Sequence, residues 1–244
     1  MNRLQLREIL DILNRRTGVT FTHYHKSAVM NAIREECVYD DIDDYIEKLK
    51  QDDALINKLS SKILVGVTSF FRNPEFFEHL KHLIPHTGHL RCWVAGCATG
   101  EEAYSLAIIL EELGYDYEII ATDISMDRII QAHEGVYGKG ISCDIKKERL
   151  ERFFEKSADG YKVKGLRHRI DFRTHELFED EIIHDVDVLL CRNVLIYFNE
   201  YNYDYLYKKF YSSLKKQGLL CVGQVEEVVS DLFEKVDDCI YKKI

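Results

Sequence analysis

Residues 93–110 decide the fold, because they join a buried strand, a short loop and a helix; they read WVAGCATGEEAYSLAIIL. Gly96 opens a turn after the apolar run, and Gly100 stands just before the helical stretch. Glycine at these points allows a tight turn and close approach of the backbone to a ligand. The segment has neither the G-x-G-x-x-G pattern nor the Walker lysine, so it does not predict dinucleotide or phosphate binding. A plain structural turn is the alternative.

Acidic residues accompany this loop. The pair Glu101-Glu102 stands at the start of the helix, where it would repel a pyrophosphate and favour a cationic ligand. Asp123 comes near the end of the next apolar run, YEIIATDI at 117–124, about twenty residues after the loop, where nucleotide-binding α/β proteins place an acid on the ribose hydroxyls. Asp123 or Ser125 could instead cap the following helix. Loop and acids together favour an adenosine-containing sulfonium cofactor.

Apolar runs and helical stretches alternate from Gly88 to the end of the sequence. The runs lie at 90–97, 117–124, 169–178, 186–198, 218–224 and 239–244, and the helical stretches at 101–114, 126–134 and about 200–216. Such alternation is typical of a mostly parallel sheet covered by helices. Glycine-rich sequence interrupts it, and we expect a small inserted subdomain at about 136–170.

The first part of the chain has helical periodicity instead. We therefore expect a helical domain over 1–87 and an α/β domain over 88–244. Residues 1–34 hold six Lys and Arg against two acids, whereas residues 35–53 hold nine acids against two Lys. Two interpretations stay open: ordinary solvated helix faces, or a docking surface for an acidic partner.

Composition excludes several classes of protein. Hydrophobic residues make up 46% of 244, which is too many for a disordered chain, and the net charge of −9 argues against general nucleic-acid binding. The seven cysteines include no C-x-x-C pair, and no apolar run approaches the roughly 20 residues of a membrane span. We expect a reduced, cytoplasmic, monomeric protein without a metal or membrane insertion.

Two further segments place polar side chains beside apolar ones. In VDVLLCRNVLIYF (186–198) an apolar strand stops at Cys191-Arg192-Asn193, where open α/β sheets bind ligands, and Tyr197 follows. We interpret Cys191 as a packed thiol. In VTSFFRNPEFF (67–77), Arg72 follows two phenylalanines and precedes Asn73, the expected N-cap of a helix. A charge beside a buried pair needs a partner.

Four motifs in order resemble the CheR family of S-adenosylmethionine-dependent chemotaxis-receptor glutamate O-methyltransferases. They are TSFFRNPEFF (68–77), GCATGEEAYS (96–105), ATDI (121–124) and CRNVLIYF (191–198). The resemblance spans almost the whole chain. It implies a class I methyltransferase domain, Rossmann-like with a mostly parallel seven-stranded sheet, joined to a small all-α N-terminal domain and carrying a small inserted subdomain.

The resemblance also implies roles for particular residues. Arg72 and Tyr197 would lie near the transferable methyl, as the catalytic residues. The residues implied to bind S-adenosylmethionine, or its product S-adenosylhomocysteine, are Thr68, Arg72, Ala95, Gly96, Glu101, Glu102, Asp123, Glu176, Leu177, Cys191, Arg192 and Asn193. The chain departs from the family at some positions: Glu176-Leu177 replaces Asn-Leu, and Gly223-Gln224-Val225-Glu226 replaces Gly-His-Ser-Glu.

The partner implied is the cytoplasmic helices of methyl-accepting chemotaxis receptors. Their glutamates would dock on Arg15, Arg16, Lys26 and Arg34. The segment between Phe154 and Arg173 looks shorter than in members that dock on a receptor's C-terminal pentapeptide, which argues against that tether. The alternatives are a methyltransferase for another protein or small molecule, and a signalling module that binds the cofactor without transferring methyl.

Overall fold

The chain forms two compact units in the structure, a computed structural model that describes residues 1–37, 41–64, 66–85 and 88–244. Unit 1 comprises Met1–Gly66 and Ile196–Tyr203, and unit 2 comprises Val67–Leu195 and Asp204–Ile244. The expected domain boundary falls at residue 87, which lies outside the described residues. The expected division of roles between two domains stays a prediction.

Unit 1 is built on helices whose apolar residues recur at helical spacing. They are α1 (Arg3–Thr17), α2 (Lys26–Glu36), α3 (Ile42–Gln51) and α4 (Asp53–Ile63). Asn2 begins α1 with a capping box, since its side chain accepts from the Leu4 and Gln5 amides. Each helix buries one stripe, with Leu13, Ile33, Leu49 and Leu59 almost fully inaccessible to solvent. The hydrophobic effect on these stripes holds the small unit together.

A short segment from the second half of the chain belongs to unit 1. Tyr24 and Phe198 form an isolated β-bridge, and the His25 amide donates to the Tyr197 carbonyl at 2.9 Å. The Asn199 side chain donates to the Tyr24 carbonyl at 2.8 Å. These bonds join residues nearly 180 positions apart, so sequence periodicity alone does not reveal them.

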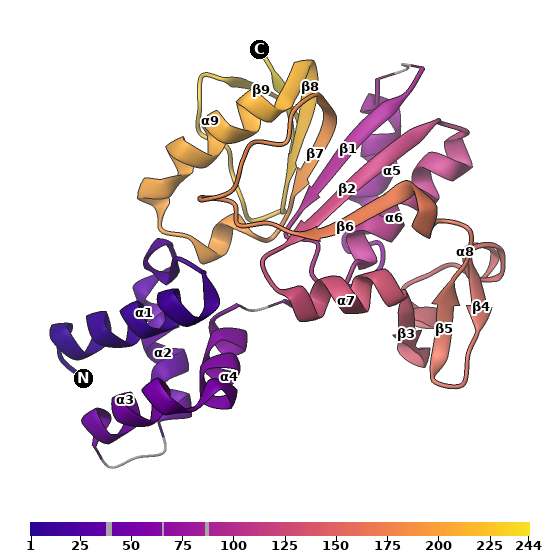
Figure 1. The fold of residues 1–244 in the computed structure, drawn as a ribbon. Coiled ribbons are helices and arrows are strands. Elements are labelled where there is room, and N and C mark those ends of the chain that lie inside the picture. Colours follow the sequence, from indigo (N-terminus) through magenta and orange to yellow (C-terminus); the bar gives the residue numbers. More distant parts are fainter. Residues whose placement is uncertain (38–40, 65, 86–87) are drawn as a thin grey trace. The chain divides into compact units, whose positions relative to one another are not determined.

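The centre of unit 2 is a seven-stranded sheet in the order β6-β2-β1-β7-β8-β10-β9 (Figure 1). Its strands are β1 (Leu90–Ala95), β2 (Tyr117–Asp123), β6 (Ile170–Thr174), β7 (Val186–Cys191), β8 (Leu214–Val222), β9 (Phe233–Asp237) and β10 (Ile240–Lys243). The first five strands in this order run parallel, and β10 lies antiparallel between β8 and β9. The expected mostly parallel seven-stranded sheet is confirmed.

Helices cover the two faces of this sheet. One face packs against α5 (Pro74–Leu83), α6 (Glu101–Leu113) and α7 (Met126–Glu134) through buried residues such as Cys92 and Val94 of β1. Trp93 points to the opposite face, where its ring lies 6.1 Å from Phe210 of α9 (Tyr203–Ser213). The alternation follows from the period of two along a strand.

A three-stranded antiparallel sheet is inserted into unit 2. It has the order β3-β5-β4, formed by β3 (Val136–Gly138), β4 (Phe154–Lys156) and β5 (Gly160–Val163), and α8 (Lys147–Phe153) precedes β4. Gly160 has φ +152°, and a Cβ there would meet the Tyr137 carbonyl oxygen at 2.2 Å. The close pairing of β5 with β3 therefore requires glycine.

The structure differs from the sequence expectation in the last third. The helix expected to reach about 216 ends at Ser213, and Leu214 already begins β8. Strand β9 was not expected at all. It lies at the sheet edge and buries only Phe233 well, so its sequence carries little apolar alternation.

Candidate functional site

The loop between β1 and α6 has a backbone that few residues tolerate. Gly96, Ala98 and Gly100 all have positive φ, at 74°, 47° and 95°. A Cβ on Gly96 would meet Val194 Cγ2 at 2.5 Å, and one on Gly100 would meet Ala132 Cβ at 2.9 Å. The two glycines thus let the loop lie tightly against its neighbours, and Ala95 directly before it is fully buried.

Asp123, at the end of β2, holds this loop in place. Its Oδ2 accepts from the Ala98 amide at 2.9 Å, and its Oδ1 accepts from the Ser125 amide at 3.0 Å. The residue is 6% exposed, and burial raises its pKa while the amide hydrogen bonds oppose that rise. The Asp123 carboxylate therefore pins a non-glycine residue, Ala98, in the left-handed conformation.

The two glutamates that begin α6 differ in their partners. Glu102 Oε1 accepts from Arg192 Nη1 at 2.5 Å, whereas Glu101 Oε2 accepts from the Thr99 hydroxyl at 2.6 Å. Burial raises the pKa of both carboxyls, and for Glu102 the charges of Arg192 and Arg72 act against that rise. Glu102 is therefore paired with a buried arginine, whereas Glu101 accepts a hydrogen bond from a neutral hydroxyl.

Arg192 follows β7 and is buried with its guanidinium among polar and aromatic groups. Its Nη2 donates to the Arg72 carbonyl at 3.1 Å and to Asn73 Oδ1 at 3.0 Å. Its Cζ lies 4.0 Å from the centre of the Phe76 ring. The cation–π contact and the Glu102 carboxylate together offset the cost of removing the charge from water.

The segment that carries Arg72 has an unusual backbone on both sides of it. Phe71 and Asn73 have φ of 49° and 61°, and the Phe71 amide donates to the Ser105 hydroxyl at 2.9 Å. Arg72 itself is exposed, and its Nη1 donates to the Val67 carbonyl at 3.1 Å, one residue before the half-buried Thr68. Asn73 is at the N-cap position expected from the sequence, but its side chain makes no capping hydrogen bond.

The β7 and β8 ends are joined by a glutamate that was not predicted as a site residue. Glu226 Oε2 accepts from the Asn193 amide at 2.8 Å and from the Gly223 amide at 2.5 Å. Asn193 has φ 58°. Among the residues that the structure describes, six non-glycine residues have positive φ, and four of them lie at this edge of the sheet: Phe71, Asn73, Ala98 and Asn193. Strained backbone of this kind clusters at functional sites. The sequence signal for Glu226 was its position three residues after Gly223, in the spacing Gly223-x-x-Glu226.

Cys191 and the segment after β6 complete the edge. Cys191 is fully buried, as expected for a packed thiol, and this burial raises the pKa of the thiol well above its usual range. Glu176 and Leu177 are buried, and Glu176 Oε1 accepts from the Phe178 amide at 3.2 Å. Its Oε2 is buried and has no hydrogen-bond partner among the residues that the structure describes.

The unpaired Glu176 Oε2 bears on whether this edge of the sheet fits the expected cofactor, S-adenosylmethionine. A buried acceptor without a partner costs free energy unless a ligand supplies a donor. S-adenosylmethionine carries an amino group on its adenine, an ammonium group and a sulfonium cation. The acids Glu101, Asp123 and Glu176 offer acceptors and negative charge to such a ligand, so the residues present fit it.

The predicted site residues fall into two sets. All those expected to bind the cofactor lie in unit 2, along the β1, β2, β6 and β7 ends and the segment before α5. Tyr197 belongs to unit 1, as do Arg15, Arg16, Lys26 and Arg34. Arg16 forms an ion pair with Asp53, and Arg15 Nε donates to the Asp11 carbonyl at 3.0 Å. Lys26 and Arg34 are exposed on α2.

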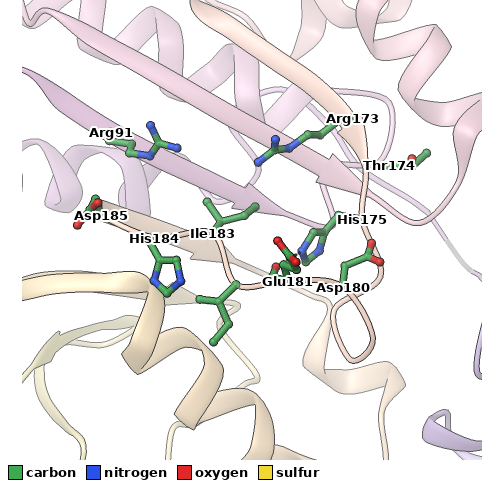
Figure 2. A pocket seen from close by; sticks show the side chains of 10 residues that line it. Arg91, Arg173, Thr174, His175, Asp180, Glu181, Ile183, His184 and Asp185 are labelled. Atoms are coloured by element: carbon green, nitrogen blue, oxygen red, sulfur yellow. Dashed lines mark hydrogen bonds between the residues drawn. The ribbon is translucent and has the colours of Figure 1, made fainter.

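A cavity of about 610 Å³ lies on the sheet face that Trp93 also faces. Figure 2 shows Arg91 and Arg173, which reach it from β1 and β6, and His175 and His184, which reach it from the segment between β6 and β7. The His175 ring lies edge-on to the Trp93 ring, with 5.5 Å between the ring centres. Burial lowers the pKa of His175. The lining of this cavity includes both arginines and the acids Asp180, Glu181 and Asp185, so it does not favour one sign of ligand charge.

No helix within the described ranges has the length and apolar composition needed to cross a membrane.

Comparison with known proteins gives one family. The family model described as "CheR methyltransferase, SAM binding domain" matches residues 66–241. A protein of Listeria innocua named "Chemotaxis protein methyltransferase" is 32% identical over 90% of this chain and 88% of its own length. A Salmonella typhimurium protein of the same name is 27% identical over 90% of this chain and 82% of its own length.

A third relative carries a different name. The "Probable biofilm formation methyltransferase WspC" of Pseudomonas aeruginosa is 28% identical over 88% of this chain and 55% of its own length.

Proposed function

Because the chain belongs to the CheR methyltransferase family, we propose that it transfers methyl groups from S-adenosylmethionine to glutamate side chains of chemotaxis receptors. The matched region is the SAM-binding domain of that family, so S-adenosylmethionine is the cofactor. The observation that supports the proposal most is the convergence of Glu101, Asp123, Glu176 and the Arg72 segment on the strand ends of unit 2.

Each acid has a separate task in this proposal. Asp123 holds the ribose hydroxyls with the lone pairs that its two backbone bonds leave free. Glu101 faces the methionyl ammonium, because Glu102 is neutralised by Arg192. Glu176 Oε2 accepts from the adenine amino group, and Leu177 packs on the ring.

The rest of the site serves alignment. S-adenosylmethionine supplies a methyl group on a positively charged sulfur, which is open to direct displacement. A substrate glutamate has an ordinary pKa of about 4.3 and is already anionic at neutral pH, so the chain does not have to remove a proton from it. The exposed guanidinium of Arg72 orients that carboxylate, and the Tyr197 hydroxyl orients either reactant. Correct alignment is the main source of rate in such a reaction.

Unit 1 is proposed to recognise the receptor. Receptor methylation helices carry glutamates, and the exposed Lys26 and Arg34 of α2 would attract them. Arg15 and Arg16 would contribute to the same field, although Arg16 also forms its ion pair with Asp53.

The test uses cofactor labelled in its methyl group. The protein is incubated with it and with membranes that bear chemotaxis receptors, and the products are then treated with alkali. Methyl esters release volatile labelled methanol, whereas N-methyl products do not. We expect label that appears as methanol from the receptor band. Label in other membrane proteins alone would favour another protein substrate, and no label in any protein would contradict transfer.

Two variants test the catalytic residues in the same assay. Arg72→Ala and Tyr197→Phe are expected to lower turnover by about 100-fold, which is the cost of misaligned reactants, while the melting temperature stays near that of the wild type. A variant that unfolds easily but keeps its activity per folded molecule would show that the residue is structural.

A further inference from the structure

A continuous series of side-chain hydrogen bonds runs beside Arg72, from the buried Arg192–Glu102 pair to the exposed Gln224 and Glu75. Arg192 donates through Nη1 to Glu102 at 2.5 Å and through Nη2 to Asn73 Oδ1 at 3.0 Å. Asn73 Nδ2 then donates to Gln224 Oε1 at 2.8 Å, and Gln224 Nε2 donates to Glu75 Oε1 at 2.9 Å. We call this series, from Glu102 to Glu75, the Arg192 relay.

The Asn73 side chain takes part in the relay and does not cap the helix that it precedes. An asparagine at the N-cap usually accepts from an amide of the first helical turn. At the start of α5 the Asn73 side chain makes no such bond, and both ends of its amide serve the relay instead. The residue also holds φ at 61°, a conformation that costs free energy and persists when its surroundings enforce it.

The relay fixes the backbone of Arg72 while leaving its guanidinium exposed. The Arg72 carbonyl accepts from Arg192 Nη2 at 3.1 Å, and the next residue is held from both sides. The opposite neighbour, Phe71, is buried and tied to Ser105. Arg72 therefore projects toward solvent from a backbone that hydrogen bonds hold on both sides.

We propose that Asn73 and Gln224 are positioning residues for methyl transfer, which act by holding Arg72 in place through Arg192. This inference rests on the methyl transfer proposed above. Gln224 follows β8, at a position where the sequence departs from the usual family ending. Its amide suits the relay, because the oxygen accepts from Asn73 while the nitrogen donates to Glu75.

The first test measures turnover in Gln224→Met, which keeps the length of the side chain and removes both hydrogen bonds. We expect kcat at saturating receptor and cofactor to fall about 10-fold, since misplacement of a positioning group by about 1 Å has effects up to 10²-fold. Cofactor affinity by calorimetry and melting temperature are expected to match the wild type. Asn73→Asp, which keeps the acceptor for Arg192 and loses the donor to Gln224, is expected to have a similar effect. Gln131→Met, at an exposed glutamine of α7, is the matched control and should retain full kcat.

A double-mutant cycle tests whether Gln224 acts through Arg72. In an Arg72→Ala background, Gln224→Met is expected to cause no further loss of kcat, because the group that it positions is already absent. An equal loss in both backgrounds would overturn the proposal, as would an unchanged kcat in Gln224→Met of an active protein.

A second measurement does not depend on activity. Trypsin cleaves after Arg72 only when that segment opens locally, so cleavage there follows the stability of its support. We expect faster cleavage at Arg72 in Gln224→Met than in the wild type or Gln131→Met, with cleavage elsewhere unchanged. If the wild type forms no methyl ester, the proposed function fails and this result still decides the relay: equal cleavage rates overturn it.

Discussion

Arg192 in unit 2 and Arg16 in unit 1 each pair with a carboxylate, but in opposite surroundings. The side chains of Arg192 and Glu102 are 1% and 13% exposed, whereas those of Arg16 and Asp53 are 39% and 76% exposed. A buried ion pair is costly to break because one charge is left unpaired, while an exposed pair contributes little and is screened by salt. In this chain, buried charge therefore sets geometry, and exposed charge is suited to attraction at a distance.

The largest effect is expected from breaking the buried pair. Glu102→Gln leaves the Arg192 charge buried without its counter-charge, so the free energy of unfolding should fall by about 3–5 kcal/mol in urea titrations. The counterpart Asp53→Asn in unit 1 should cost less than about 1 kcal/mol. Lys208→Met, which breaks the exposed pair with Asp204 in unit 2, is the control in the same unit. Similar small losses in all three variants would mean that Glu102 is protonated in the native protein and the comparison fails.

Cofactor binding should suffer next. Asp123→Ala removes an expected ribose contact and the bonds to Ala98 and Ser125, so the affinity for S-adenosylmethionine and for S-adenosylhomocysteine should weaken by about 1.5–3 kcal/mol. Isothermal calorimetry measures both, with Asp231→Ala, at an exposed aspartate of the same unit, as the control. Equal affinity in Asp123→Ala and wild type would contradict the ribose assignment.

A smaller effect concerns pH. Burial raises the pKa values of Asp123, Glu101 and Glu176, so these carboxyls take up protons at a higher pH in the free folded protein than in the unfolded chain. Their folded-state pKa is raised, so the stability that they contribute is present at low pH and is lost as pH rises through the raised values. A cationic ligand favours the charged forms, so its affinity should fall as pH drops through the same values, with protons released on binding.

Calorimetry in two buffers of different ionisation enthalpy counts those protons. Glu176→Gln removes one of the three titrating groups and should reduce the release while leaving Asp123 and Glu101 unchanged. Proton release that is zero at every pH between about 4 and 7 would exclude these carboxyls from the binding site.

The smallest effect is expected from the exposed charges. Lys26→Glu combined with Arg34→Glu should raise the Michaelis constant for receptor a few-fold at low salt, and the difference should shrink near physiological salt, where the Debye length is about 8 Å. Cofactor affinity should not change. Lys48→Glu, in the acidic half of unit 1, serves as the control. Parallel salt curves for variant and wild type would assign these charges to ordinary solvation.

Sequence reasoning was strongest where one chain segment carries the whole signal. The strands of residues 90–95, 117–123 and 186–191 are continuous apolar runs, and the glycines after the first have a local steric purpose. Strand β9 gave no such signal, because an edge strand that buries mainly Phe233 does not need alternation. The sequence also did not predict that residues 196–203 belong to unit 1, because this depends on long-range hydrogen bonds such as that from the His25 amide to the Tyr197 carbonyl.

The site was predictable to a similar degree. The motif residues Gly96, Asp123 and Arg192 were singled out, but what their side chains contact was not. Asp123 bonds to its own loop, and the Arg192 guanidinium faces Glu102 and Asn73. Gln224 and Glu226 were noted only as departures or matches in a motif, because their importance comes from the meeting of β7 and β8 with the segment before α5. Such contacts are set by tertiary packing, which no local pattern encodes.

The burial of Trp93 has a practical consequence for measurement. It is the one tryptophan in the sequence, it is fully buried in β1, and its indole donates to the Thr122 hydroxyl at 2.9 Å. Its fluorescence should be blue-shifted in the native protein and should respond to unfolding of unit 2 alone, since unit 1 contributes tyrosine but no tryptophan. The Trp93 indole also makes an edge-on contact with His175. His175 directly precedes Glu176, which lies at the strand end expected to meet adenine. One emission spectrum can therefore follow unit 2 through unfolding and through occupation of that strand end.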